Sequence, residues 1–120
     1  PLTKETEGMI SEAFFAALNE PIVLINTGRG AVIDWPSFVG AFREGLVEAA
    51  GLDVLPTEPP DFDDELLRAW SDDEKSVRDR LIITPHAAYY SEEAFRELRR
   101  KAAEEALRML KGERLLNCLN

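Results

Sequence analysis

Three short apolar runs constrain the fold of this chain more than any other feature. They occupy residues 22–25, 49–54 and 81–84 and consist mainly of Val, Ile, Leu and Ala. Continuous apolar runs of this length are typical of strands that are buried on both faces of a sheet. Helical sequence lies between them, and strands that alternate with helices pair in parallel through crossovers. The pattern predicts an α/β fold with a parallel sheet of three or four strands and flanking helices.

The expected helices carry recognisable end signals. Ser11 is a good N-cap for a helix over residues 12–18, and Asp34 caps a second helix that Gly45 ends. Residues 64–80 are charged and irregular, with one or two helical turns. Ser91 starts the longest helix, which extends to about residue 111.

Composition excludes several classes of function. The net charge of −9 argues against direct nucleic-acid binding, which needs a basic surface. No apolar run approaches the ~20 residues that cross a bilayer. One His and one Cys predict no transition-metal site, and the single Cys118 fits a buried thiol in a reducing, cytoplasmic compartment. At 120 residues, we expect a single domain over residues 1–120.

Polar groups follow each of the three apolar runs. Arg29, between two glycines, follows the first run, Asp53 and Glu58 belong to the second, and His86 follows the third. Because the carboxyl ends of parallel strands meet at one edge of a sheet, where ligands bind, these side chains are expected to share a cleft.

The residue types in this cleft suit the reduction of a 2-oxo acid. A guanidinium binds a carboxylate through two parallel hydrogen bonds. An imidazole transfers a proton near neutral pH, and a nearby carboxylate favours its charged form. Each residue also has a simpler interpretation. Arg29 would be a loop residue, His86 a structural histidine, Glu58 a turn residue and Asp53 a helix cap.

Four motifs together resemble a known family. "PLTKETEGMI", "LINTGRGAVID", "AAGLDVLPTEPP" and "ITPHAA" occur in the order found in the NAD-binding domain of the D-isomer-specific 2-hydroxyacid dehydrogenases. The tail "TPHAAYYSEEAFRELRRKAAEEALRML" and the closing "NCLN" are most similar to the C-terminal binding protein branch, NAD(H)-binding relatives that include transcriptional corepressors. The resemblance implies a Rossmann-like fold and covers essentially the whole chain.

The resemblance also implies roles for individual residues. The catalytic residues would be Arg29, which binds the substrate, Glu58 as the acid partner, and His86 as the general acid and base. The cofactor-binding residues would be Thr27, Gly28, Arg29, Asp53, His86 and Ala88, with Asp53 receiving the nicotinamide carboxamide. Tyr89 stands where the binding-protein branch has tryptophan, and would contact the substrate with Arg29.

The sequence departs from the family in what it lacks. It contains no G-x-G-x-x-G fingerprint, no acidic residue about 20 positions after one, and no substrate-binding domain. We therefore expect the C-terminal half of a Rossmann domain, inactive by itself, from an NAD-dependent oxidoreductase of 2-hydroxy and 2-oxo acids that forms homo-oligomers; NADP is not excluded. The alternative is a non-catalytic interaction module or a corepressor-like NAD(H) sensor. A glycine fingerprint upstream of Pro1 would favour the enzyme.

Overall fold

The structure is a computed structural model that describes residues 2–117. The chain divides into two compact units, Pro1–Ala88 and Tyr89–Asn120, and each is described by itself. The expectation of one domain over residues 1–120 stays a prediction, and Cys118 lies outside the described residues. No helix in the described part of the chain is both long and apolar enough to cross a membrane.

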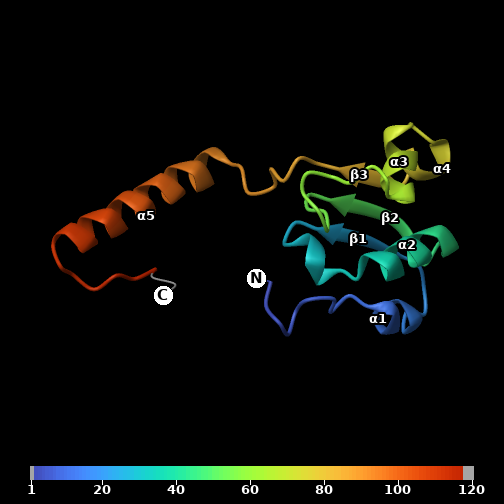
Figure 1. Ribbon diagram of the computed structural model, residues 1–120, viewed down its shortest axis with the longest axis horizontal. Helices are drawn as coiled ribbons and strands as arrows, with labels where there is room; N and C mark the ends of the chain where they lie inside the picture. Colours follow the sequence, from blue (N-terminus) through green and yellow to red (C-terminus); the bar gives the residue numbers. More distant parts are fainter. Residues whose placement is uncertain (1, 118–120) are drawn as a thin grey trace. The chain divides into compact units, whose positions relative to one another are not determined.

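The first unit is built on a sheet of three parallel strands. These are β1 (Ile22–Asn26), β2 (Val47–Leu52) and β3 (Leu81–Ile83), in the order β1-β2-β3 (Figure 1). Leu24 pairs with Ala50, and Ala50 pairs in turn with Leu81. The predicted α/β parallel sheet is therefore confirmed.

Two details of the predicted strands are wrong. β2 begins at Val47 and ends at Leu52, so it starts and stops two residues before the predicted run. The strands are also not buried on both faces, because the side chains of Val23, Ile25 and Ile82 are 62%, 71% and 67% exposed. The helices of residues 2–88 leave these three side chains uncovered.

Within residues 2–88, four short α-helices and one 3-10 helix accompany the sheet: α1 (Glu12–Ala16), η1 (Gly30–Val32), α2 (Trp35–Glu44), α3 (Glu65–Ser71) and α4 (Lys75–Arg78). The ends of α2 follow the prediction, because the Asp34 carboxylate accepts a hydrogen bond from the Ser37 amide and Gly45 ends the helix at φ 83°. The largest fully buried side chains lie between α2 and the sheet: Phe38, Phe42, Val47, Leu52 and Leu81. This core fixes the strands whose carboxyl ends carry the polar groups.

The second unit contains one long helix, α5 (Glu92–Leu110). Ser91 Oγ accepts a hydrogen bond from the Ala94 amide, which confirms the predicted start. The helix carries ion pairs along its surface, such as Lys101 with Glu97 at 2.7 Å. None of its residues is buried within the described structure.

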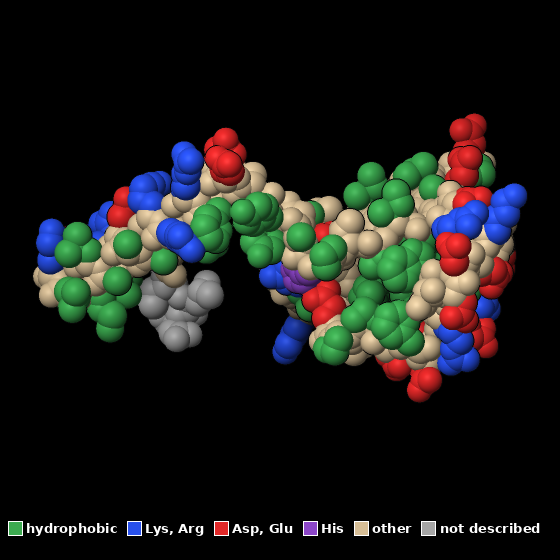
Figure 2. Space-filling model, turned by 90° about the horizontal axis from the view of Figure 1, so that it is seen from above, with side chains coloured by type: hydrophobic (Ala, Val, Ile, Leu, Met, Phe, Trp, Pro, Cys, Tyr) green, Lys and Arg blue, Asp and Glu red, His purple; other side chains and the backbone are tan. Residues whose placement is uncertain are grey.

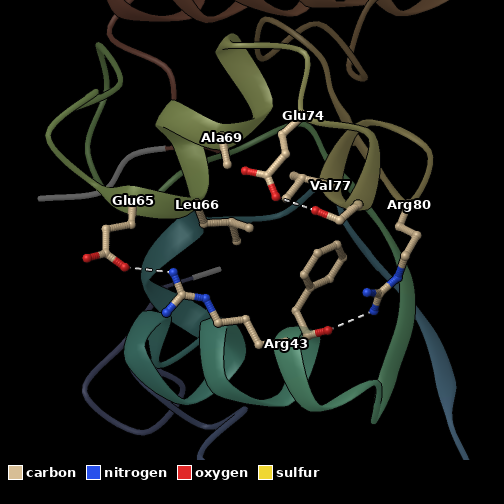
Figure 3. Close-up of a pocket in the computed structure, with 9 residues that line it drawn as sticks. Arg43, Glu65, Leu66, Ala69, Glu74, Val77 and Arg80 are labelled. Atoms are coloured by element: carbon tan, nitrogen blue, oxygen red, sulfur yellow. Dashed lines mark hydrogen bonds and ion pairs between the residues drawn. The ribbon is translucent and has the colours of Figure 1, made fainter.

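Arg80, just before β3, ties α2 to β2 at the amino ends of the strands. Its Nε donates to the Glu48 carbonyl, and its Nη2 donates to the carbonyls of Phe42 and Val47, all at 2.7 Å. The guanidinium also lies 4.2 Å from the centre of the Phe42 ring. In Figure 3 a dashed line joins the Arg80 guanidinium to a backbone carbonyl oxygen, which is one of these hydrogen bonds. One guanidinium thus connects the last turn of α2 to the first two residues of β2.

We expect Arg80→Ala to lower the free energy of unfolding by roughly 1.5–3 kcal/mol, the usual value of a hydrogen bond to a charged group. Arg80→Lys should recover little, since a point charge cannot reach three carbonyls in a fixed fork. Urea denaturation measures the change. Arg78→Ala is the matched control, because Arg78 makes exposed ion pairs with Asp73 and Asp79 that contribute about 0–1 kcal/mol. Equal losses of unfolding free energy in the two alanine variants would contradict a stabilising role for the three Arg80 hydrogen bonds.

Candidate active site

The loop after β1 is held in place by the last residue of the strand. Asn26 Oδ1 accepts a hydrogen bond from the Gly28 amide at 3.0 Å, and Asn26 Nδ2 donates to the Arg29 carbonyl at 3.0 Å. This local ring of bonds is typical of asparagine in turns. The exposed Arg29 guanidinium donates to the Gly28 carbonyl at 2.8 Å and makes no ion pair with a described residue. The loop therefore presents Arg29 with donors available to an anion.

Gly30 brings this loop against the loop that follows β2. A Cβ atom at Gly30 would lie 2.0 Å from the Leu55 carbonyl oxygen and 2.7 Å from the Pro56 nitrogen. Contacts with backbone at such distances do not occur in folded proteins, so only glycine fits. The close approach places the Arg29 loop beside the loop that carries Glu58.

His86 and Glu58 form a hydrogen-bonded pair, with 2.7 Å between Nδ1 and Oε2. Oε1 of Glu58 accepts a second bond from the Leu55 amide at 3.1 Å. These bonds, that of His86 above all, hold the pKa of Glu58 below its ordinary value, and the Arg29 charge acts in the same direction. Both side chains are about 40% exposed, so the pair is accessible to a ligand. With Nδ1 engaged, Nε2 is the ring nitrogen available to a reacting atom.

Asp53 follows β2 and is buried, with only 5% of its surface exposed. Its Oδ1 accepts hydrogen bonds from the Thr84 hydroxyl and, at 2.9 Å, from the Ala87 amide; its Oδ2 accepts one from the Ala88 amide at 2.9 Å. The Thr84 bond is the main cause that holds the pKa of Asp53 below its ordinary value, although burial acts in the opposite direction. A buried carboxylate is thus kept charged by partners from the segment around His86.

Two pockets meet at the His86–Glu58 pair. The smaller one, about 190 Å³, contains Arg29 together with both members of the pair. The larger one, about 510 Å³, also has Glu58 and His86 in its wall. Its remaining wall is mainly apolar, from Leu55, Pro60, Phe62, Trp70 and Ile83. The histidine, purple in Figure 2, is visible at the surface beside an acidic side chain. A charged arginine and an apolar wall therefore adjoin the same imidazole.

The structure brings together the residues that the strand-end argument selected. Arg29, Glu58 and His86 share one pocket, and Asp53 bonds to the backbone on the far side of His86. Thr27 and Gly28 lie in the Arg29 loop, and Ala88 lies in the Asp53 network. Tyr89 belongs to the second unit, so its contact with substrate stays a prediction.

Sequence reasoning missed two residues that position this site, Asn26 and Thr84. For Asn26 the signal was available, because asparagine before a Thr-Gly pair at a strand end favours a turn closed by its own side chain. For Thr84 no local signal exists. Its partner Asp53 is 31 residues away and becomes a neighbour only through the pairing of β2 with β3.

A third pocket, of about 390 Å³, lies at the opposite ends of the strands, between α2 and the α3–α4 segment (Figure 3). Its charged groups have partners within the protein: Arg43 pairs with Glu65 at 2.7 Å, Glu74 accepts a hydrogen bond from Ser76, and Arg80 binds carbonyls. Nothing in this pocket calls for a ligand.

Comparison with known proteins shows which family has this arrangement. The family model for "D-isomer specific 2-hydroxyacid dehydrogenase, NAD binding domain" matches residues 1–88. The chain belongs to this family. The matched residues are the whole first unit, including all three strands and the loops that carry Arg29, Glu58 and His86.

Curated relatives of the chain include enzymes that are named for different substrates. The chain is 33% identical over its whole length to D-3-phosphoglycerate dehydrogenase of Archaeoglobus fulgidus and spans 21% of that protein. It is 34% identical over its whole length to glyoxylate reductase of Korarchaeum cryptofilum and spans 33% of that protein. The chain thus covers a third or less of these relatives.

Solved 2-hydroxyacid dehydrogenase structures show the same fold. D-lactate dehydrogenase from Lactobacillus jensenii, solved with NAD+, matches the whole chain with a TM-score of 0.75 and 30% identity, over 37% of its own length. A D-isomer specific 2-hydroxyacid dehydrogenase from Xanthobacter autotrophicus Py2, solved with NADPH and MES, matches with a TM-score of 0.78 and 30% identity, over 45% of its length. These relatives are dehydrogenases and reductases, so they support the family and not the narrower C-terminal binding protein branch.

Proposed function

We propose that this chain supplies the catalytic half of the NAD-binding domain in an enzyme that interconverts 2-oxo and 2-hydroxy acids with NAD(H). The observation that carries the proposal is the 2.7 Å bond between His86 and Glu58 in the same pocket as Arg29. An anion-binding guanidinium and a proton donor beside each other match the two polar ends of a 2-oxo acid. The family membership of the chain points to the same reaction.

In the proposed reduction, Arg29 binds the substrate carboxylate and orients the adjacent carbonyl toward His86. A bound dihydronicotinamide would supply the hydride for C2. His86 then donates the proton on Nε2 to the carbonyl oxygen, which becomes the hydroxyl of the product. Glu58 holds Nδ1 and balances the charge of the imidazolium before the transfer. In the oxidation direction the same nitrogen accepts the hydroxyl proton.

The chain fits one end of the cofactor. Asp53 Oδ2 accepts one hydrogen bond from the described residues, so its second lone pair is available to an amide such as the nicotinamide carboxamide. Thr27, Gly28 and Ala88 would lie along the same end. The phosphate-binding turn has no counterpart in this sequence. The choice between NAD and NADP belongs to the ribose-binding residue that such a turn precedes, and NAD is our preference.

Arg29→Lys tests the substrate part of the proposal. In the complete enzyme we expect kcat/KM for 2-oxo acids to fall roughly 100-fold, mainly through a higher KM for the acid, because an ammonium cannot hold a carboxylate with two parallel bonds. Following NADH absorbance with a panel of 2-oxo acids measures both constants. Arg43→Lys is the control, since Arg43 lies in the third pocket. Wild-type KM in Arg29→Lys would remove Arg29 from the substrate site.

The proposal has three further parts: self-association, cellular location and an alternative without catalysis. Self-association would involve the exposed Val23, Ile25 and Ile82 on a sheet whose edges are β1 and β3. A cytoplasmic location would suit a chain with a single cysteine.

The alternative of a corepressor-like NAD(H) sensor would use the same pocket without turnover. A complete protein that binds NADH but reduces no 2-oxo acid would support this alternative.

A further inference from the structure

His86 has a backbone conformation that is uncommon outside glycine, although histidine adopts it more often than most residues do. Its φ is 53°, in the left-handed region that side chains with a Cβ avoid. Such a conformation persists only where the surrounding structure holds it. The His86 amide donates to the Thr84 carbonyl at 2.9 Å, which closes a tight turn but does not connect that turn to the sheet. The Glu58 bond holds the imidazole itself, so other contacts must hold the backbone turn that carries it.

Asp53 provides those contacts on both sides of His86. Its carboxylate accepts the Thr84 hydroxyl from the residue two positions before His86 and the amides of Ala87 and Ala88 after it. We call these four residues, Asp53, Thr84, Ala87 and Ala88, the latch. The latch is attached to the ends of the strands, because the Asp53 amide donates to the Asn26 carbonyl at 2.9 Å and the Thr84 amide donates to the Leu52 carbonyl at 3.0 Å.

The latch also fixes the distance between His86 and its partner. Asp53 and Glu58 belong to one loop, in which Glu58 is tied to the Leu55 amide. The histidine turn is thus bound to the same loop at two points, through the Asp53 carboxylate and through the Glu58 carboxylate. Loss of the first connection frees the turn to relax from φ 53° and carries Nδ1 away from Oε2.

We propose that Thr84 is a positioning residue for the acid/base histidine, acting through the Asp53 carboxylate to keep His86 directed at Glu58. The inference rests on the proposed function for its catalytic consequence. Its structural part, the dependence of the His86–Glu58 bond on the Thr84 hydroxyl, stands without it. The simpler alternative is that the hydroxyl only ends β3, in which case its removal leaves the pair unchanged.

Thr84→Val and Thr84→Ser separate these alternatives. Valine keeps the shape and removes the donor, whereas serine keeps the donor and serves as the matched control. Carboxyl NMR titration of the 120-residue chain reports the result without substrate or cofactor. In Thr84→Val we expect the pKa of Asp53 to rise because its main hydrogen bond is gone, and the pKa of Glu58 to rise because its bond from His86 loosens. Hydrogen exchange at the Ala87 and Ala88 amides should accelerate.

An unchanged pKa of Glu58 in Thr84→Val, with that of Asp53 raised, would overturn the proposal, because the latch would then open without moving His86. Should the valine variant not fold, Thr84→Ala gives the same comparison with less bulk.

In the complete enzyme, Thr84→Val should lower kcat roughly 10- to 100-fold with little change in KM for the 2-oxo acid, and Thr84→Ser should restore it. A shifted Glu58 pKa with wild-type kcat would overturn the catalytic role of Thr84. A wild-type protein without any reductase activity would instead contradict the proposed function and leave the NMR result as the test of the latch.

Discussion

Gly30→Ala is expected to lower the free energy of unfolding of the first unit by roughly 3 kcal/mol or more, at the upper end of what overpacking costs. The added methyl would lie 2.0 Å from the Leu55 carbonyl oxygen and 2.2 Å from its carbon. Both atoms belong to backbone, so no side-chain rotation relieves the contact. The Arg29 loop and the Glu58 loop would have to separate.

Tryptophan fluorescence during urea denaturation measures this change cleanly. The two tryptophans of the sequence, Trp35 and Trp70, both lie in the first unit, so α5 does not contribute to the signal. Gly28→Ala is the matched control, because its Cβ would meet only Asn26 Oδ1 at 3.5 Å, an ordinary contact. If the two glycine variants unfold at the same urea concentration, the close approach of the two loops is not what requires glycine at position 30.

The fold was predictable because its signals are local. The helix cap at Asp34, the stop at Gly45 and the apolar runs all depend on residues within one turn or one strand. The exposed sheet face was not predictable for the opposite reason. Val23 and Ile25 have the sequence of a strand covered on both sides, yet no helix of residues 2–88 covers their side chains. The apolar residues of a strand show which faces could be buried. Whether they are buried depends on the elements that pack against the strand.

The site was predictable to the level of one sheet edge and no further. Parallel topology alone brings Arg29, Glu58 and His86 to the same edge, and that expectation is confirmed by their shared pocket. The hydrogen-bond partners of Asp53 could not be predicted from the sequence. They depend on the register between β2 and β3 and on the left-handed conformation of His86, which no sequence motif indicates. The parallel topology predicts which residues lie at this edge of the sheet. The register between β2 and β3 determines which of them form hydrogen bonds.

The largest effect on activity is expected from His86. In the complete enzyme, His86→Ala should reduce kcat roughly 10²- to 10⁴-fold, the usual contribution of a positioned acid or base, while KM for NADH changes little. His86→Asn is the cleaner variant, because asparagine tolerates the left-handed conformation and so preserves the turn. Steady-state assays in both directions measure the loss. Near-normal turnover in His86→Asn would show that another group moves the proton.

Glu58→Gln should separate the charge of Glu58 from its hydrogen bond. The bond from His86 keeps the pKa of Glu58 below its ordinary value, so the wild-type carboxylate is charged throughout the neutral range. A carboxylate favours the protonated ring that reduction requires, whereas the amide of glutamine accepts the same bond without charge. In Glu58→Gln the rate of reduction should therefore decline at a lower pH than in the wild type, and the rate of oxidation should rise from a lower pH. Since one nitrogen serves both directions, the two profiles must shift together, and a shift in only one of them would contradict the assignment of His86 as the shared acid and base.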